Sequence, residues 1–284
     1  MVYAKGEFII LRKSNVTVTG HMIVKNEERW IWYSIMSVID FVDELIIFDT
    51  GSTDNTVRII KDIKSKYEKK IVFEEKGSVS PYEFYILRQE QIERTKSLWF
   101  FVVDGDEIWY KKDLEKARYF LENDKECKLL SVKFINYAGD IYHYRDFNRE
   151  TYYIDGIKGS ITIRFYSMAI TGIKCVGKYG VEGYYDIENK PVQTGNWKIK
   201  NIDGSYLHMS LLQRSGKLKG DLDIKYRWKK YKADWDHRFP ANFKYPEVFY
   251  FKRPREIWNP WIQHIGLFDY IFCFFRKLRS KFRK

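Results

Sequence analysis

The first hundred residues alternate between short apolar runs and stretches in which apolar positions recur with helical spacing. Short apolar runs bounded by turn residues predict buried strands, whereas apolar positions at i, i+3, i+4 and i+7 predict helices. We therefore expect strands at residues 16–24, 44–48, 71–75 and 98–103, with helices at 28–39, 55–66 and 82–95. This alternation predicts an α/β fold with a largely parallel sheet flanked by helices.

After residue 107 the pattern changes, and we expect strands at 129–137, 161–166 and 170–176 joined by longer connections. Beyond residue 210 the chain becomes basic and aromatic. There Ile224, Trp228, Tyr231 and Trp235 are spaced to share one helix face, which more often packs on a core than faces a sugar. We place a soft boundary near residue 211, between a domain at 1–210 and a helical extension at 211–284.

The net charge of +12 calls for an anionic partner or substrate. Six of the last nine residues are Lys or Arg, and they follow the apolar, aromatic run 265–275. This order is typical of a helix lying on an anionic bilayer, so residues 264–284 are a candidate membrane-surface segment. The alternative is a terminal helix packed on the core with a solvated basic tail. Nucleic acid is not favoured as a partner because no recognition motif accompanies the charge.

The chain shows neither the apolar core of a secretion signal at its start nor a run of about 20 apolar residues that would span a membrane. Cys127, Cys175 and Cys273 are widely spaced, without a metal-ligand or redox pattern, and predict free thiols. We expect a cytoplasmic protein, peripheral on the cytosolic face of a membrane.

An acidic cluster, Asp104-Gly105-Asp106-Glu107, directly follows the expected strand 98–103. Neighbouring carboxylates repel one another unless a cation lies between them, and a hard divalent ion such as Mg²⁺ or Mn²⁺ is the usual one. An ion held by one or two carboxylates keeps positions open for the oxygens of a diphosphate. A lone D-x-D is equally compatible with an acidic surface turn.

A second acidic position gives the first more weight. Asp49 ends the expected strand 44–48, Gly51 permits a tight turn, and Ser52, Thr53 or Asp54 can cap the helix that follows. Ligands of open α/β sheets bind outside the carboxyl ends of the strands. Two strands that end in aspartates at one sheet edge therefore form a candidate site.

Three segments together resemble glycosyltransferase family 2, and most closely its small lipopolysaccharide-core hexosyltransferases. They are Asn26-Glu27-Glu28, Asp49-Thr50-Gly51-Ser52-Thr53-Asp54 and Asp104-Gly105-Asp106-Glu107. The resemblance covers roughly residues 16–210. It implies the GT-A fold, a Rossmann-like, mixed but mostly parallel sheet, with a nucleotide half at about 16–107 and an acceptor half at about 108–210.

The resemblance also implies site residues. Asp106 is the first choice as ligand of Mn²⁺ or Mg²⁺, and Asp104 touches the ribose or reaches the metal through water. His208 is a candidate third ligand, although a histidine in an apolar run is more often a core residue. Asp49 accepts a hydrogen bond from the base, and Ser52 in the same turn is placed with the donor.

Three further donor contacts come from the same resemblance. Glu27 lies where it can contact the ribose or base, while Asn26 either joins it or, like Glu28, caps the first helix. Arg88 matches the arginine of the family's A-R-N segment, but Gln89 replaces the asparagine.

The general base is assigned through an H-E pair of the lipopolysaccharide-type relatives. Glu182 matches the glutamate, and Val181 replaces the histidine. Asp186 is the reserve candidate and Asp155 the third, and an ordinary loop carboxylate is the structural alternative for Glu182.

These features predict an inverting, metal-dependent glycosyltransferase that moves a hexose from a UDP- or GDP-linked donor to a cell-envelope or lipid-linked glycan. A nucleotidyltransferase of similar fold is a second hypothesis, but residues 20–27 are acidic where its glycine-rich, basic loop would lie. A third is an inactive, membrane-associated adaptor that retains the fold. Turnover of nucleotide sugars with and without EDTA separates the three.

Overall fold

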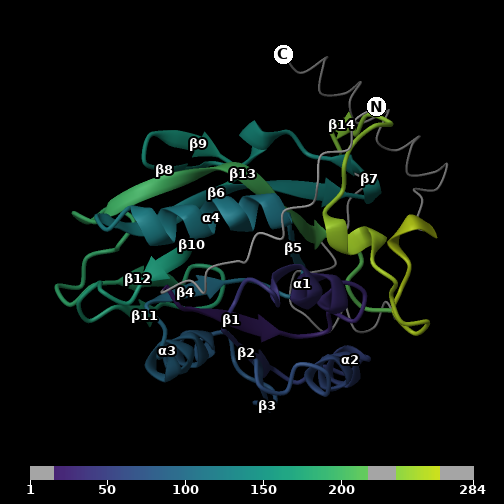
Figure 1. The fold of residues 1–284 in the computed structure, drawn as a ribbon, viewed down its shortest axis with the longest axis horizontal. Coiled ribbons are helices and arrows are strands. Elements are labelled where there is room, and N and C mark those ends of the chain that lie inside the picture. The colour runs from purple at the N-terminus through teal and green to yellow at the C-terminus, as the bar shows by residue number, and fades with distance from the viewer. Residues whose placement is uncertain (1–15, 217–234, 263–284) are drawn as a thin grey trace, which may run out of the picture.

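The computed structural model describes residues 16–216 and 235–262 (Figure 1). Ile224, Trp228 and Tyr231 of the predicted helix face lie outside these residues, as do the candidate membrane segment 264–284 and Cys273. Cys127 and Cys175 are buried, free thiols, as predicted. Within the described ranges no helix is long and apolar enough to cross a membrane.

A ten-stranded sheet forms the centre of the molecule. Its first four strands are parallel, in the order β4-β1-β2-β3. Their bounds are β1 (Val18–Val24), β2 (Glu44–Asp49), β3 (Ile71–Glu75) and β4 (Trp99–Val102). Since these strands run in one direction, their carboxyl ends meet at one edge, which positions the candidate site.

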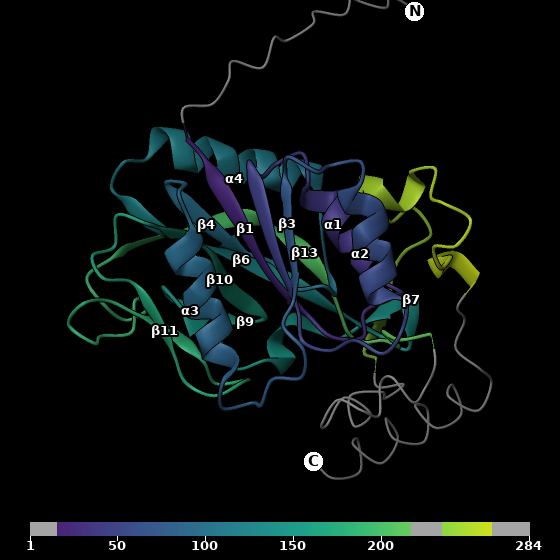
Figure 2. The ribbon, with the colours of Figure 1, turned by 90° about the horizontal axis from the view of Figure 1, so that it is seen from below.

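Helices cover both faces of this parallel part: α1 (Ile31–Val38), α2 (Thr56–Lys64) and α3 (Phe84–Arg94) (Figure 2). Along β2, Leu45 and Ile47 belong to the core cluster that contains α1 and α2. The intervening Ile46 and Phe48 pack with α3 instead. This alternation follows from the two-residue period of a strand, and it explains why residues 45–48 of β2 are all apolar.

The second half makes the sheet mixed. β10 (Ile161–Ser167) pairs antiparallel with both β4 and β6 (Cys127–Ala138). β13 (Lys198–Leu211) runs parallel to β6 and antiparallel to β5 (Glu107–Trp109). The remaining elements are α4 (Lys111–Asn123), β7 (Asp140–Tyr144), β8 (Tyr152–Ile154), β9 (Ile157–Gly159), β11 (Lys174–Val176), β12 (Gly183–Tyr185), β14 (His237–Arg238) and the 3₁₀ helices η1 (Phe147–Arg149), η2 (Glu247–Tyr250) and η3 (Pro260–Ile262).

The predicted fold class is confirmed: a mixed α/β sheet with flanking helices. The first-half elements lie where the periodicity placed them, within a few residues at each end. The sequence analysis missed α4, although Leu114, Ala117 and Leu121 are buried along it at helical spacing. It also missed the length of β13, and the predicted strand 170–176 shrinks to β11.

Residues 235–262 pack against α1 and β7. Val248 and Phe249 are buried in the main core cluster, and the Tyr33 hydroxyl donates to the carbonyl of Trp258 at 2.8 Å. This described stretch contains β14, η2 and η3, and its side chains share the core of the preceding residues. The segments for which helices are predicted in the extension lie almost entirely outside the described residues.

Candidate active site

The two loops that follow the carboxyl ends of β1 and β2 are held together by hydrogen bonds. Asn26, with a left-handed φ of 52°, accepts a hydrogen bond from the Thr53 amide at Oδ1 (2.7 Å) and donates its own amide to Ser52 Oγ (2.8 Å). The Glu27 amide donates to Thr56 Oγ1 at 2.7 Å. Asn26 and Ser52, both predicted to bind the donor, thus touch each other and shape the loop.

Glu28 corrects one expectation from the sequence. It was expected to cap the first helix, yet its Oε2 accepts hydrogen bonds from the amide and the side chain of Asn55, both at 2.8 Å. Asn55 directly precedes α2, so Glu28 secures the start of the second helix. The carboxylate is drawn there because the first amides of a helix lack partners within it.

Asp49 carries a free acceptor. Its Oδ2 accepts from the amides of Gly51 (2.9 Å) and Ser52 (3.0 Å), which fixes the carboxylate. Gly51 has φ 85°, a conformation that other residues adopt at a cost. The second oxygen, Oδ1, is buried and has no hydrogen-bond partner among the described residues. A buried, unsatisfied acceptor is costly, so an N–H or O–H group of a ligand is the natural partner.

The acidic cluster is held against the Glu27 loop because Gly105 has no side chain. A Cβ at this position would lie 2.9 Å from Val24 Cγ1 and 3.0 Å from Glu27 Cγ. This close approach brings Asp104 and Asp106 to the carboxyl end of β1, as the sequence predicts.

Asp104 lies between two arginines. Arg88 Nη2 is 2.7 Å from Asp104 Oδ1, and Arg164 Nη1 is 3.5 Å from Oδ2. Burial favours the neutral acid, but the two guanidinium groups prevail and lower the pKa of Asp104. Asp104 is therefore an ionised acceptor at neutral pH, and Arg88, whose donor contact was in doubt, is its principal partner.

Glu107 forms a second ion pair, with Arg164. Its side chain is fully buried and is bound by Arg164, which also donates to the Tyr206 hydroxyl at 2.9 Å. Burial raises the pKa of Glu107 well above its usual range, and Arg164 opposes that rise. The sequence analysis missed Arg164, although a single arginine inside the apolar strand Ile161–Ser167 was a usable signal.

Asp106 meets a third arginine. Arg214 Nη1 is 2.6 Å from Asp106 Oδ2 and 3.0 Å from Glu27 Oε1, so one guanidinium bridges two loops. The segment after β13 that carries Arg214 is fixed by its backbone, since the Arg29 amide donates to the Arg214 carbonyl at 3.0 Å. No motif marks Arg214, and the sequence analysis missed it too.

His208 lies beside Asp106, as predicted for a third metal ligand. The register of β13 and β5 pairs it with Glu107, and its Nε2 is 3.6 Å from Asp106 Oδ2. Two ligand atoms bound at about 2.1 Å to one ion lie about 3.0–4.2 Å apart, for angles between 90° and 180°. Asp106 and His208 therefore fit a shared divalent ion.

Two observations qualify this fit. In the part of the chain that the structure describes, no three His, Cys, Asp or Glu side chains converge on one metal position. An ion held by Asp106 and His208 thus needs oxygens from a bound substrate or water. Arg214 also occupies Asp106 Oδ2, so an ion and this guanidinium compete for the same carboxylate.

The candidate bases differ in their surroundings. Glu182 is half-buried in the loop between β11 and β12, where its charge acts on Arg88. Asp186 accepts hydrogen bonds from the amides of Glu188 and Lys190, both at 3.0 Å, and from Trp197 Nε1 at 3.2 Å.

These bonds to Asp186 stabilise a turn and leave little capacity for an acceptor proton. Backbone hydrogen bonds, chiefly from Lys190, lower the pKa of Asp186, which also suits a structural anion. Asp155 sits in the β8–β9 turn with φ 48°. Of the three candidates, Glu182 is the one in electrostatic contact with Arg88.

Comparison with known proteins adds relatives to this geometry. Glycosyltransferase SunS of Bacillus phage SPbeta is 32% identical over 133 residues, which are 44% of this chain and 29% of SunS. Uncharacterized glycosyltransferase RT0209 of Rickettsia typhi is 28% identical over 127 residues, 43% of this chain and 40% of the relative. The matched segments thus span less than half the length of either relative.

Similar solved structures include S. aureus TarS, with a TM-score of 0.46 and 16% identity over 68% of this chain and 37% of TarS. Another is glucosyl-3-phosphoglycerate synthase from Mycobacterium tuberculosis in complex with Mn²⁺, UDP and phosphoglyceric acid. Its TM-score is 0.32 and its identity 21%, over 42% of this chain and 44% of the synthase.

The family model for glycosyl transferase family 2 matches residues 21–177, which is more than half of the 284 residues. The matched range contains the Asn26 loop, the Asp49 turn, the acidic cluster and Arg164. The chain belongs to glycosyltransferase family 2.

Proposed function

We propose that this chain transfers a hexose from a nucleotide diphosphate sugar to a glycan acceptor by an inverting, metal-dependent reaction. The observation that carries the proposal is the arrangement at one sheet edge. Asp49 lies at this edge, and one of its buried carboxylate oxygens has no hydrogen-bond partner among the described residues. Asp104 and Asp106 lie at the same edge, and each is bound by an arginine.

The donor half of the proposal uses these three aspartates. Asp49 Oδ1 accepts from an N–H of the base, which favours uracil or guanine rings over rings without such a donor. Asp104 is held ionised by Arg88 and accepts from ribose hydroxyls, with Glu27 beside it. Asn26 and Ser52 act by holding the loop in which the nucleotide lies.

The residues proposed to act on the diphosphate of the donor are Asp106, His208 and Arg214. Asp106 and His208 would hold Mn²⁺ or Mg²⁺, which supplies positive charge to the departing diphosphate. Arg214 is a second cation at the same position. When a diphosphate binds, Arg214 exchanges Asp106 for phosphate oxygens, to which its planar guanidinium can donate two parallel hydrogen bonds.

Glu182 is the proposed general base. It removes the proton from the acceptor hydroxyl while that oxygen attacks the anomeric carbon and the diphosphate leaves from the opposite face. A single displacement of this kind inverts the anomeric centre and needs no covalent intermediate. The charge of Glu182 acts on Arg88, the arginine that also binds Asp104.

The acceptor side of the proposal rests on the resemblance and on charge. We assign residues 1–210 to the transferase domain, with the acceptor bound by its second half, and residues 211–284 to an extension. A cell-envelope or lipid-linked glycan suits the +12 net charge and a location at the cytosolic face of an anionic membrane.

The test is a thermal-shift panel of UDP- and GDP-linked sugars with Mn²⁺, because a ligand that binds only the folded state raises the melting temperature. Asp106→Asn should lose the Mn²⁺-dependent part of the shift, whereas Asp62→Asn on the exposed face of α2 should keep it. Release of a nucleoside diphosphate supports glycosyl transfer. Release of pyrophosphate would show a nucleotidyltransferase instead, and no shift with any donor would contradict the proposal.

A further inference from the structure

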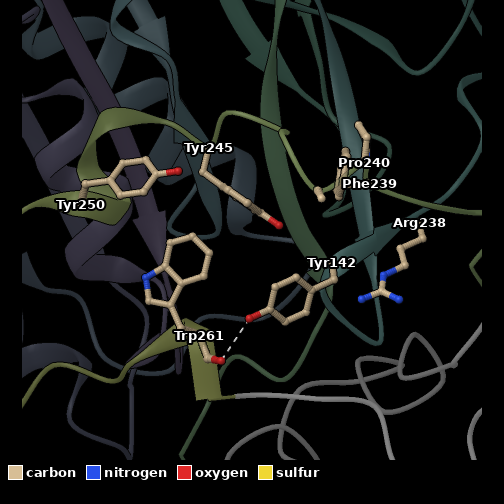
Figure 3. Close-up of a pocket in the computed structure, with 8 residues that line it drawn as sticks. Tyr142, Arg238, Phe239, Pro240, Tyr245, Tyr250 and Trp261 are labelled. Carbon is tan, nitrogen blue, oxygen red and sulfur yellow. Dashed lines mark hydrogen bonds between the residues drawn. The ribbon is translucent and has the colours of Figure 1, made fainter.

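An aromatic cavity lies outside the candidate active site, where residues 238–261 pack against β7 (Figure 3). Its volume is about 660 Å³, within the range of about 300–1,000 Å³ usual for small-molecule sites. Its main lining residues are Tyr142, Arg238, Phe239, Tyr245, Tyr250 and Trp261. None of these side chains contacts the aspartates of the candidate active site.

The aromatic walls are fixed before any ligand binds. The Tyr142 hydroxyl donates to the Trp261 carbonyl at 3.1 Å, and the Tyr245 hydroxyl donates to the Ile141 carbonyl at 3.0 Å. Tyr245 and Trp261 meet edge to face, with ring centroids 4.9 Å apart. Rings held in this way lose little conformational freedom when a ligand stacks on them.

Three hydrogen-bond donors at the cavity have no partner among the described residues: the Arg238 guanidinium, the Tyr250 hydroxyl and Trp261 Nε1. Figure 3 shows Arg238 at the opposite end of the cavity from Tyr250 and Trp261. Asp and Glu are absent from the lining residues. The cavity thus offers a positive charge at one end, and aromatic faces with two further donors at the other.

We infer that this cavity binds an anionic sugar, meaning a sugar ring that carries a phosphate or carboxylate group. The C–H groups of a sugar ring are weakly positive and pack well on the negative faces of Tyr and Trp rings. The anionic substituent pairs with Arg238, whose two amino groups match the oxygens of a phosphate or carboxylate. A cationic ligand is disfavoured because Arg238 repels it and the described lining residues include no carboxylate.

From the position of the cavity we infer that the anionic sugar is a unit of the acceptor glycan. This inference rests on the proposed function. Trp258, three residues before Trp261, packs edge-on against Trp30 with ring centroids 5.0 Å apart. Trp30 follows the Glu27 loop and hydrogen-bonds the Gln213 carbonyl next to Arg214 at 2.9 Å. Packing through Trp258 and Trp30 therefore connects the cavity to the segment that carries Arg214.

The experiment is a set of binding titrations on the full chain, monitored by NMR. The probes are glucuronate and glucose 6-phosphate, with glucose and inorganic phosphate as the matched halves. Both anionic sugars should bind at least about tenfold more tightly than either half, because ring and charge are recognised together. Equal binding of phosphate alone and glucose 6-phosphate would overturn the inference.

Matched variants locate the binding. Arg238→Gln should weaken the anionic sugars about tenfold, and Arg255→Gln, at another exposed arginine outside the cavity, should not. Tyr250→Ala should weaken both sugars, whereas Tyr119→Ala on α4 should not, although each tyrosine is 64% exposed. Equal losses in a variant and its control would overturn the inference.

A donor-induced thermal shift in the same variants keeps the two proposals apart. The shift with a nucleotide sugar and Mn²⁺ should be unchanged in all four variants, because none of them touches the aspartate edge. Anionic-sugar binding at Arg238 without any donor shift contradicts the proposed function alone. A donor shift without sugar binding contradicts the cavity inference alone.

Discussion

Removing the Arg214 guanidinium tests the diphosphate end of the site most directly. In the structure Arg214 Nη1 is 2.6 Å from Asp106 Oδ2 and 3.0 Å from Glu27 Oε1. Both carboxylates are nearly buried, at 3% and 4% residue exposure. Arg214→Ala removes the guanidinium that bridges them, and each becomes a better ligand for a divalent ion.

The expected gain in Mn²⁺ affinity follows from the hydrogen bond that a bound ion must displace. A hydrogen bond to a charged group contributes about 1.5–3 kcal/mol net, and an ion that binds Asp106 Oδ2 must break the one from Arg214. Without that competitor, Mn²⁺ should bind Arg214→Ala about ten- to hundredfold more tightly than it binds the parent chain. With Mn²⁺ saturating, the nucleotide sugar should bind more weakly, because the phosphates lose a cation.

Electron paramagnetic resonance of Mn²⁺ without nucleotide measures the first effect, and a donor titration at saturating Mn²⁺ measures the second. Arg214→Lys retains a charge and should lie between the parent and Arg214→Ala in Mn²⁺ affinity. Arg58→Ala, at an exposed arginine of α2, is the matched control. Thermal unfolding should show a lower melting temperature for Arg214→Ala without metal, and a larger gain on adding Mn²⁺.

Unchanged or weaker Mn²⁺ binding in Arg214→Ala would refute the competition between the guanidinium and the ion. Tighter Mn²⁺ binding with unchanged donor binding would instead refute the role of Arg214 at the phosphates. The loop itself should survive the substitution, because the Arg214 carbonyl keeps its hydrogen bond from the Arg29 amide.

Three further outcomes follow. Arg164→Met should cost about 3–5 kcal/mol in urea unfolding, because it leaves the fully buried Glu107 without its cation, and adding Glu107→Gln should recover part of that loss. Burial, with Arg88 nearby, lowers the pKa of His21 well below its usual value, so stability should be lost as pH falls through the unfolded pKa of about 6.5; by about pH 5.5 the loss should be about 1.4 kcal/mol, and His21→Gln should abolish this dependence. Glu182→Gln should abolish turnover while donor affinity stays the same, and near-normal turnover would remove Glu182 from the mechanism.

The acidic half of the site was predictable because local patterns determine it. A short apolar run followed by an aspartate and a glycine-containing turn predicts both a strand and the side chain at its end. Parallel order then places Asp49 and Asp104 at one edge, whichever strand lies between them. In the structure the register of β1 with β2 pairs Val24 with Asp49.

The basic half was not predictable in this way, because long-range register sets it. Arg164 lies 57 positions from Glu107, and Arg214 lies 108 positions from Asp106. Their placement depends on β10 crossing antiparallel between β4 and β6 and on β13 pairing with β5. No local pattern carries that pairing: the single arginine in the apolar strand Ile161–Ser167 marks Arg164 as unusual but does not identify its partner.

These arginines change the argument for a metal. The acidic cluster alone seemed to require a divalent ion, because neighbouring carboxylates repel. The fold meets much of that requirement itself, since Asp104 is held by Arg88 and Asp106 by Arg214. Charge balance in the free protein is therefore no reason to expect a bound ion. In the proposed reaction the need for an ion would arise when a diphosphate brings its own negative charge and draws Arg214 away from Asp106, so that an ion could bind the oxygen that faces His208. On this reasoning metal and donor bind together, and the affinity for either should rise in the presence of the other.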